Sequence, residues 1–429
     1  MKKRFINAIN RPFIRNVLIL VTGTAGAQFI GMALSPIITR LYGPEAYGMM
    51  STFASFITII APVAALTYPV AIVLPELDKE ANLLVRLSFL TAGTVSLLIG
   101  LFIVFFHQYI VTIFRLEEIS SYLYLIPFVV FSAGVLQIIE QWMIRTRQFS
   151  VSSKATLVQS LIVNGNKAGI GYFYPTSSVL ISLSALNHGL KAIFLIIFAK
   201  DRIQISKLYK GTDKKSLKPI AKKYNDFPLF RAPQTVVNSI SVNIPILMLV
   251  SFFGPVSVGF YSICRTVLSM PTRLLAKSVG DVFYPKISTI ASEGENVTNT
   301  IKKATYGLTV IGIVPYGVIV FFGPSLFEFV FGSDWRIAGE YARWISFWSL
   351  TTFIAQPIIK SLPVLSAQRF HLNYTVLSLI VRISMLGLGY FLFSSDVVAI
   401  ALFGVTSGLM NLFLIILTLN ISKKFDRQS

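Results

Sequence analysis

Cysteine and histidine are scarce in this sequence. Its 429 residues include one cysteine, Cys264, and three histidines that lie far apart. A single cysteine excludes a disulfide framework and a thiolate metal cluster. Neither a GxxxxGK[ST] phosphate-binding loop nor an HExxH motif occurs. The sequence therefore predicts no metal site, no cofactor and no enzymatic activity, and Cys264 is expected to be a small buried hydrophobe.

Charged residues are scarce as well. Only 13% of the residues are charged, whereas 54% are hydrophobic and the mean hydropathy is +0.70. Soluble domains carry about 25% charged residues, so these proportions predict an integral membrane protein. The basic start of the chain leads into an apolar run with no A-x-A-like cleavage site behind it. We expect that run to remain in place as the first membrane span.

Twelve apolar segments are long enough to cross a bilayer, which takes ~20 residues each. Lysine and arginine outnumber the acids and give a net charge of +20. These basic residues gather in alternate loops, as is typical of the cytoplasmic side of a membrane protein. Both termini are therefore expected in the cytoplasm. The predicted segments are 14–41, 46–74, 83–107, 120–143, 154–174, 178–199, 229–252, 256–283, 303–322, 338–360, 371–393 and 396–421.

One basic linker, residues 200–228, divides the chain into an N-terminal bundle (1–199) and a C-terminal bundle (229–429), each of six predicted helices. The motifs LYGPEAYGMMS (41–51) and FFGPVSVGFYS (252–262) share glycine, proline and serine at a constant offset, which indicates an internal duplication. An even number of spans per half predicts parallel repeats related by a pseudo-twofold axis along the membrane normal. Two such bundles enclose a central cavity and permit alternating access.

The stretch 254–286 is apolar enough to span a membrane but carries four charged residues. Each ionised group at bilayer depth costs at least ~2.5–3.5 kcal/mol, so such groups normally face a wet cavity or a partner. On one continuous helix Arg273, Lys277 and Asp281 share a face, and Arg265 lies ~80° from Arg273. Arg273 and Lys277 are one turn apart and suit a diphosphate. The alternatives are a Lys277–Asp281 ion pair or a Lys277 that snorkels to the interface.

Four further charged residues lie inside predicted spans. Lys167, Lys191 and Arg382 either face the cavity or pack elsewhere, and Lys167 follows the polar run NGN. Glu140 either pairs with Arg145 or, like Asp281, is a carboxylate that couples transport to an ion. With six cations against two acids inside the spans, the cavity is expected to attract anions, whereas exporters of organic cations need acidic cavities.

Several stretches resemble a known family, the Wzx-type O-antigen and capsule repeat-unit flippases of the multidrug/oligosaccharidyl-lipid/polysaccharide exporter superfamily. They are RLYGPEAYGMMSTF, YPVAIVLPE, KYNDFPLFRAPQTVVNSIS, FGSDWRIAGEYARW and the whole of residues 252–286. The resemblance implies a MATE-like protein of twelve helices in the bacterial inner membrane. It also implies that Arg265, Arg273, Lys277 and Asp281 lie in the functional region. A polysaccharide polymerase, a chain-length regulator and a coupling ion are the partners it implies.

The resulting hypothesis is a flippase that moves undecaprenyl-diphosphate-linked oligosaccharides from the cytoplasmic to the periplasmic leaflet through a cationic cavity. The alternative is a proton- or sodium-coupled multidrug antiporter of the same superfamily, which would depend on Glu140 or Asp281. A third possibility is a membrane scaffold without transport activity. The first hypothesis predicts binding of an anionic, lipid-linked glycan and no binding of nucleic acid, despite the high positive charge.

Overall fold

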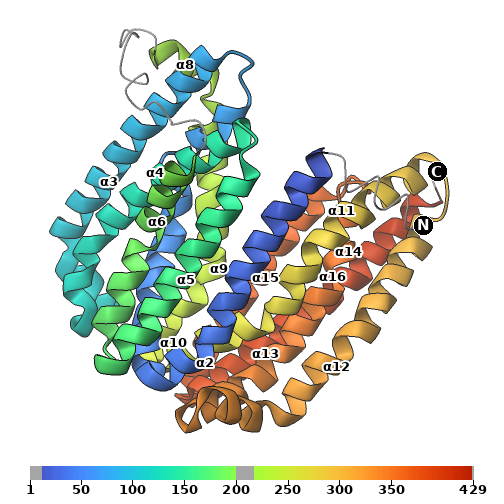
Figure 1. Ribbon diagram of the computed structural model, residues 1–429. Helices are drawn as coiled ribbons and strands as arrows, with labels where there is room; N and C mark the ends of the chain where they lie inside the picture. The colour runs from blue at the N-terminus through green and yellow to red at the C-terminus, as the bar shows by residue number, and fades with distance from the viewer. Residues whose placement is uncertain (1–11, 200–216, 428–429) are drawn as a thin grey trace. The chain divides into compact units, whose positions relative to one another are not determined.

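The computed structural model describes residues 12–199 and 217–427, without the side chains of residues 12–18, 20, 21 and 273–282. The described residues form helices joined by turns and short connections, and no strand occurs among them (Figure 1). The chain divides into two compact units, Met1–Ser251 and Phe252–Ser429. The helical composition of the described residues confirms the predicted all-helical class. Each unit is described by itself below.

The first unit contains the helices of the N-terminal half, the last part of the basic linker and the helix α9 that follows it. Long helices predominate because in a hydrocarbon surround every backbone polar group has to be paired within its own segment. The elements are α2 (Pro12–Ile60), η1 (Ala61–Val63), η2 (Tyr68–Val73), α3 (Asp78–Phe114), η3 (Glu117–Leu125), α4 (Ile126–Arg145), α5 (Phe149–Phe173), α6 (Ser177–Phe198), α8 (Leu217–Lys223), η5 (Phe227–Arg231) and α9 (Ala232–Phe253), whose last two residues pass into the second unit.

Small residues allow α2 and α5 to run close together in the first unit. A Cβ atom at Gly23 would overlap Ser153, and one at Gly26 would lie 2.9 Å from Leu157. Close approach through small residues is the usual way in which membrane helices associate, because lipid gives no hydrophobic drive for their contact. Ser160 adds a hydrogen bond across the pair, from its hydroxyl to the Ala27 carbonyl at 2.8 Å.

The second unit contains the helices of the C-terminal half. They are α10 (Pro255–Leu268), α11 (Met270–Ser292), α12 (Val297–Phe331), η6 (Ser333–Trp335), α13 (Arg336–Ile354), α14 (Gln356–Ser361), α15 (Gln368–Phe393) and α16 (Asp396–Phe425). Glycines bring neighbouring helices into contact here too: Gly339 of α13 lies against Gly323 and Pro324 of α12, and Gly404 of α16 lies against the Trp344 carbonyl.

The two Gly-Pro motifs of the predicted duplication have the same backbone conformation. Gly43 has φ 70° and ψ 174°, and Gly254 has φ 83° and ψ −177°. This region is essentially open to glycine alone. The proline that follows then starts a helix, with its φ already close to the helical value. Gly43 produces a kink inside α2, and Gly254 caps the start of α10. The sequence repeat is therefore also a repeat of local structure.

Eight helices in the described residues are long and apolar enough to cross a membrane. The twelve predicted segments overlap them as follows. Segments 14–41 and 46–74 share the kinked α2, and three others lie on α5, on α10 with α11, and on α13 with α14. None of those three is among the eight: α5 and α13 are richer in polar residues, and α10 is only 14 residues long. The predicted continuous helix over 256–283 is wrong at Ser269, which separates α10 from α11.

Gly339→Ala is expected to destabilise the protein by about 1–3 kcal/mol, since the added methyl group would overlap the backbone of Gly323 and Pro324. Gly317→Ala on α12 is the matched control, because no atom lies within 4 Å of a Cβ there. It should be neutral or stabilise the helix by up to ~1 kcal/mol. Thermal unfolding of the purified protein in detergent measures both. Equal midpoints for the two variants would contradict the close packing of α12 on α13.

Candidate functional site

The four charged residues predicted to lie at bilayer depth in the stretch 254–286, which include those expected to bind a diphosphate, lie on two helices. Arg265 is on α10 and is half-buried, whereas Arg273, Lys277 and Asp281 are on α11. The side chains of these three lie outside the described residues. Because Ser269 interrupts the helix, the ~80° expected between Arg265 and Arg273 on one continuous helix does not apply. The one-turn spacing of Arg273, Lys277 and Asp281 is kept, since α11 continues from Met270 to Ser292.

Lys191 and Glu140 form an ion pair inside the first unit. The Lys191 ammonium lies 2.7 Å from a Glu140 carboxylate oxygen, and the two side chains are 23% and 36% exposed. They come from α6 and α4, which pack against each other. His188, one turn before Lys191 on α6, interacts electrostatically with both. The two predicted site residues are therefore brought together, so that each neutralises the other.

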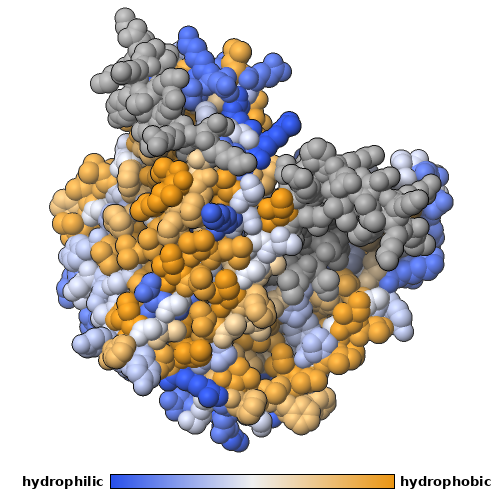
Figure 2. Space-filling view, in the orientation of Figure 1, coloured by the Kyte–Doolittle hydropathy of each residue, from blue (hydrophilic) through white to orange (hydrophobic). Residues whose placement is uncertain are grey.

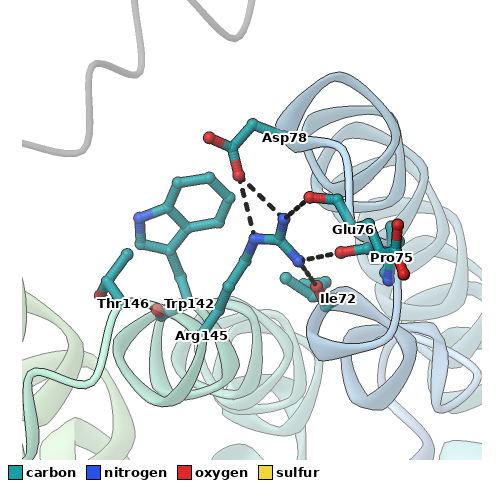
Figure 3. Close-up of polar contacts among 7 residues, drawn as sticks. All are labelled: Ile72, Pro75, Glu76, Asp78, Trp142, Arg145 and Thr146. Carbon is teal, nitrogen blue, oxygen red and sulfur yellow. Dashed lines mark hydrogen bonds and ion pairs between the residues drawn. The ribbon is translucent and has the colours of Figure 1, made fainter.

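The alternative partner for Glu140, Arg145, is engaged elsewhere, and that alternative is wrong. The Arg145 guanidinium donates to the Asp78 carboxylate at 2.8 Å and to the carbonyls of Ile72 and Pro75 at 3.1 and 2.6 Å, with a longer contact to Glu76 (Figure 3). It thereby fastens the turn between η2 and α3 to the end of α4. Its side chain is only 12% exposed, so we regard it as a structural clasp.

Lys167 lies on α5 with no carboxylate within ion-pair distance among the described side chains. Its ammonium is 3.6 Å from the Met50 thioether, and the side chain is half-buried. A thioether is a weak acceptor. The backbone carbonyl of Lys167 accepts a hydrogen bond of 2.9 Å from the Tyr42 hydroxyl, which joins α2 to α5 at this point. Lys167 is thus a half-buried cation still able to take an anionic partner.

Arg382 is held in one orientation by neutral groups in the second unit. Its Nη2 donates to Asn411 Oδ1 at 3.3 Å, and its guanidinium lies 5.6 Å from the centre of the Trp348 ring. The Asn411 amide nitrogen donates to the hydroxyls of Thr351 and Thr352 at 3.3 and 2.8 Å. Those bonds turn the Asn411 carbonyl toward the arginine, so α13 and α16 together fix a side chain of α15.

This arrangement leaves hydrogen-bond donors on Arg382. Its Nε is buried and has no hydrogen-bond partner among the described residues. An arginine keeps its charge in proteins and presents five N–H donors, of which Asn411 uses one. Sequence analysis missed the supporting residues Asn411 and Trp348. An asparagine in the middle of the apolar last span, Asn411, was the available signal.

An apolar cavity of about 500 Å³ in the first unit contains none of the predicted site residues. It is lined by side chains of α2, α3 and η3 such as Phe56, Ile99 and Phe114. It has no group suited to an anion. The described cations that were predicted to lie inside the membrane are therefore Lys167 and the Lys191–Glu140 pair in the first unit, and Arg265 and Arg382 in the second.

Comparison with known proteins identifies both a family and a fold. The family described as polysaccharide biosynthesis protein matches residues 37–339. No curated protein matches the sequence. Among solved structures, the lipid II flippase MurJ in an inward closed conformation is similar, with TM-score 0.74 and 13% identity over 95% of this chain and 90% of that one.

Two transporter structures of the MATE family are also similar. One is VcmN of Vibrio cholerae, with TM-score 0.58 and 11% identity over 99% of this chain and 98% of that one. The other is a MATE protein in complex with MaL6, with TM-score 0.53 and 12% identity over 95% and 97%. Identities this low show the fold alone. They confirm the predicted MATE-like architecture.

Glu140→Gln is expected to lower the stability of the protein by about 1–3 kcal/mol, because it leaves Lys191 partly buried without its partner. Combining it with Lys191→Gln should restore most of the loss, since no unpaired charge remains. Glu328→Gln is the control, because its pair with Arg336 is exposed and should contribute less than ~1 kcal/mol. Unfolding midpoints in detergent test this. A double variant no better than Glu140→Gln would contradict it.

Proposed function

This chain belongs to the polysaccharide biosynthesis protein family, and on that premise we propose that it is a flippase for lipid-linked oligosaccharides. It would move undecaprenyl-diphosphate-linked repeat units from the cytoplasmic to the periplasmic leaflet of the bacterial inner membrane, with both termini in the cytoplasm. The family match over residues 37–339 carries this proposal. The fold shared with a lipid II flippase supports it.

The sign of the intramembrane charge agrees with such a cargo. A diphosphate carries a concentrated negative charge, and its transfer through hydrocarbon needs cations that water does not fully screen. Lys167 and Arg382 meet this requirement among the described side chains, because neither is neutralised by a carboxylate. In this proposal Arg273 and Lys277 bind the diphosphate first and Arg265 receives it as the two bundles, 1–199 and 229–429, rock against each other.

The protein's own contribution would be positioning and neutralisation of charge. No bond of the cargo has to be made or broken to change leaflet, so the proposed activity is transport and not catalysis. The polyprenyl tail would stay in lipid while the headgroup crosses. A polysaccharide polymerase and a chain-length regulator would use the product on the far side.

A proton- or sodium-coupled multidrug antiporter is the second candidate. The fold it shares with MATE transporters favours it, as does a carboxylate inside the first unit. Glu140 faces Lys191 at 2.7 Å, so protonation of the acid would free the lysine and change the local charge. In this candidate Glu140 or Asp281 binds the coupling ion. Loss of drug efflux with normal surface glycan in a deletion strain would favour the antiporter over the flippase.

Arg382→Ala is expected to reduce surface polysaccharide at least about tenfold, the equivalent of losing one charge-assisted hydrogen bond, while the protein still reaches the membrane. Arg382→Lys should retain part of the activity, and Asn411→Leu should have an intermediate effect because it removes the bond that orients the arginine. Arg336→Ala, an exposed residue outside the apolar segments, is the control. Wild-type glycan in Arg382→Ala would remove this residue from the site.

Arg273→Ala is expected to abolish surface polysaccharide, and Arg273→Lys to restore a fraction of it, because a lysine supplies the charge without the bidentate geometry. Immunoblots of surface glycan and of membrane fractions measure product and protein together. Lipid-linked oligosaccharide should accumulate inside the cell at the same time. Arg369→Ala, a basic residue of a predicted cytoplasmic loop, is the control. Normal glycan in Arg273→Ala would contradict the proposed role of Arg273 in diphosphate binding.

A further inference from the structure

The last part of the basic linker, α8, together with η5, is amphipathic and packs against other helices of the first unit. Leu217, Ile220, Ala221 and Tyr224 recur at the spacing of one helical face. Ile220 is only 6% exposed and belongs to a core cluster with residues of η2, α3 and α4, against which Leu217, Tyr224 and Phe227 also pack. The opposite face of α8 points away from this cluster and is exposed.

Polar contacts fix this docking. The Thr67 hydroxyl donates to the Phe227 carbonyl at 2.9 Å, and the Lys223 ammonium lies 2.8 Å from the Glu80 carboxylate. The hydrogen bond with Glu80 raises the pKa of Lys223. Residues 217–231 are therefore attached to the end of the first unit at which α3 begins and α4 ends (Figure 1).

The segment 217–231 exposes both lysines and large apolar side chains. Lys218 and Lys222 are one turn apart and exposed, and neither forms an ion pair with a described residue. Leu229 and Phe230 are 60% and 70% exposed. The adjoining turn before α3 exposes Leu74, Leu77 and Lys79 in the same manner. We call residues 73–79 and 217–231 together the linker platform.

Hydrophilic residues gather at this end of the first unit, with hydrophobic ones over the face below (Figure 2). A surface that exposes leucine and phenylalanine beside lysine fits neither water nor hydrocarbon alone. It fits the boundary between them, where apolar groups enter the acyl region and ammonium groups meet phosphates. The linker platform carries five cations, Lys79, Lys218, Lys222, Lys223 and Arg231, against three acids, Glu76, Asp78 and Asp226. Asp78 and Lys223 are already engaged by Arg145 and Glu80, and the remaining excess of basic side chains favours an anionic boundary over a neutral one.

We propose that the linker platform is a binding surface for anionic phospholipid headgroups. Lys218 and Lys222 contact the lipid phosphates, and Leu229 and Phe230 insert below them. The platform thus anchors the connection between the two halves of the chain to the bilayer surface. This site is separate from the intramembrane cations and does not depend on what the protein transports.

Photo-cross-linking with lipid in vesicles tests the proposal. The full-length protein is reconstituted in phosphatidylcholine that contains a trace of photoreactive phosphatidylglycerol, and cross-links are mapped on chymotryptic peptides. Lys218→Gln combined with Lys222→Gln should reduce labelling of residues 217–231 at least about fivefold, because each lysine near an anionic surface contributes separately. Added salt should weaken labelling of the wild-type protein in the same region.

The matched control combines Lys302→Gln with Lys303→Gln, which removes two exposed lysines from the start of α12. It should leave labelling of 217–231 unchanged. Equal labelling by a photoreactive phosphatidylcholine probe, or no decrease in the Lys218/Lys222 variant, would overturn the proposal. Protection of the segment by a soluble polyglutamate peptide in vesicles without anionic lipid would also overturn it, in favour of an acidic protein partner.

Discussion

An arginine or lysine inside hydrocarbon has to find compensation for its charge, and this constraint organises the polar interior of both units. Arginine keeps its proton under all ordinary conditions, so its surroundings have to adapt. The structure shows three solutions. Glu140 neutralises Lys191 directly, a thioether is the polar contact of the Lys167 ammonium, and Asn411 with Trp348 holds Arg382 through dipole and ring. The last two leave the positive charge uncompensated by any described acid, which is the state that the proposed anionic cargo requires.

Neutral supports have a specific advantage for a transporter. A carboxylate beside Arg382 would bring the net charge of the site toward zero. It would also compete with the cargo for the same N–H donors. Asn411 instead accepts one hydrogen bond and is itself fixed by Thr351 and Thr352. The guanidinium is oriented in advance, and its net charge stays available. The Lys191–Glu140 pair is the opposite case, because the two charges cancel. Such a pair suits a site whose net charge changes only when the carboxylate is protonated.

The helical architecture was predictable from the sequence because hydrophobic length alone determines it. For the charged residues, the sequence predicted which residues lie inside the apolar segments but not which side chains contact one another. One of the two roles expected for Glu140 was an ion pair with its neighbour in sequence, Arg145. In the structure α6 brings Lys191 to Glu140 instead, and Arg145 donates to the carbonyls before α3. Such pairings depend on which helix faces which, and one sequence gives no sign of that. The break at Ser269 was missed because Ser-Met-Pro reads equally well as a kink within one span.

Gly43 and Gly254 share one further property, which concerns chirality. Their mirror-image backbone angles are those of an extended chain, which L-residues adopt readily. No neighbouring atom lies within 4 Å of a Cβ built at either position, so crowding is not the obstacle to a side chain there. Torsion alone excludes L-residues, at about 1–3 kcal/mol each. Both positions would accept D-alanine and disfavour L-alanine. Glycine, which is achiral, is therefore the encoded residue that lets the same bend form in both copies of the motif.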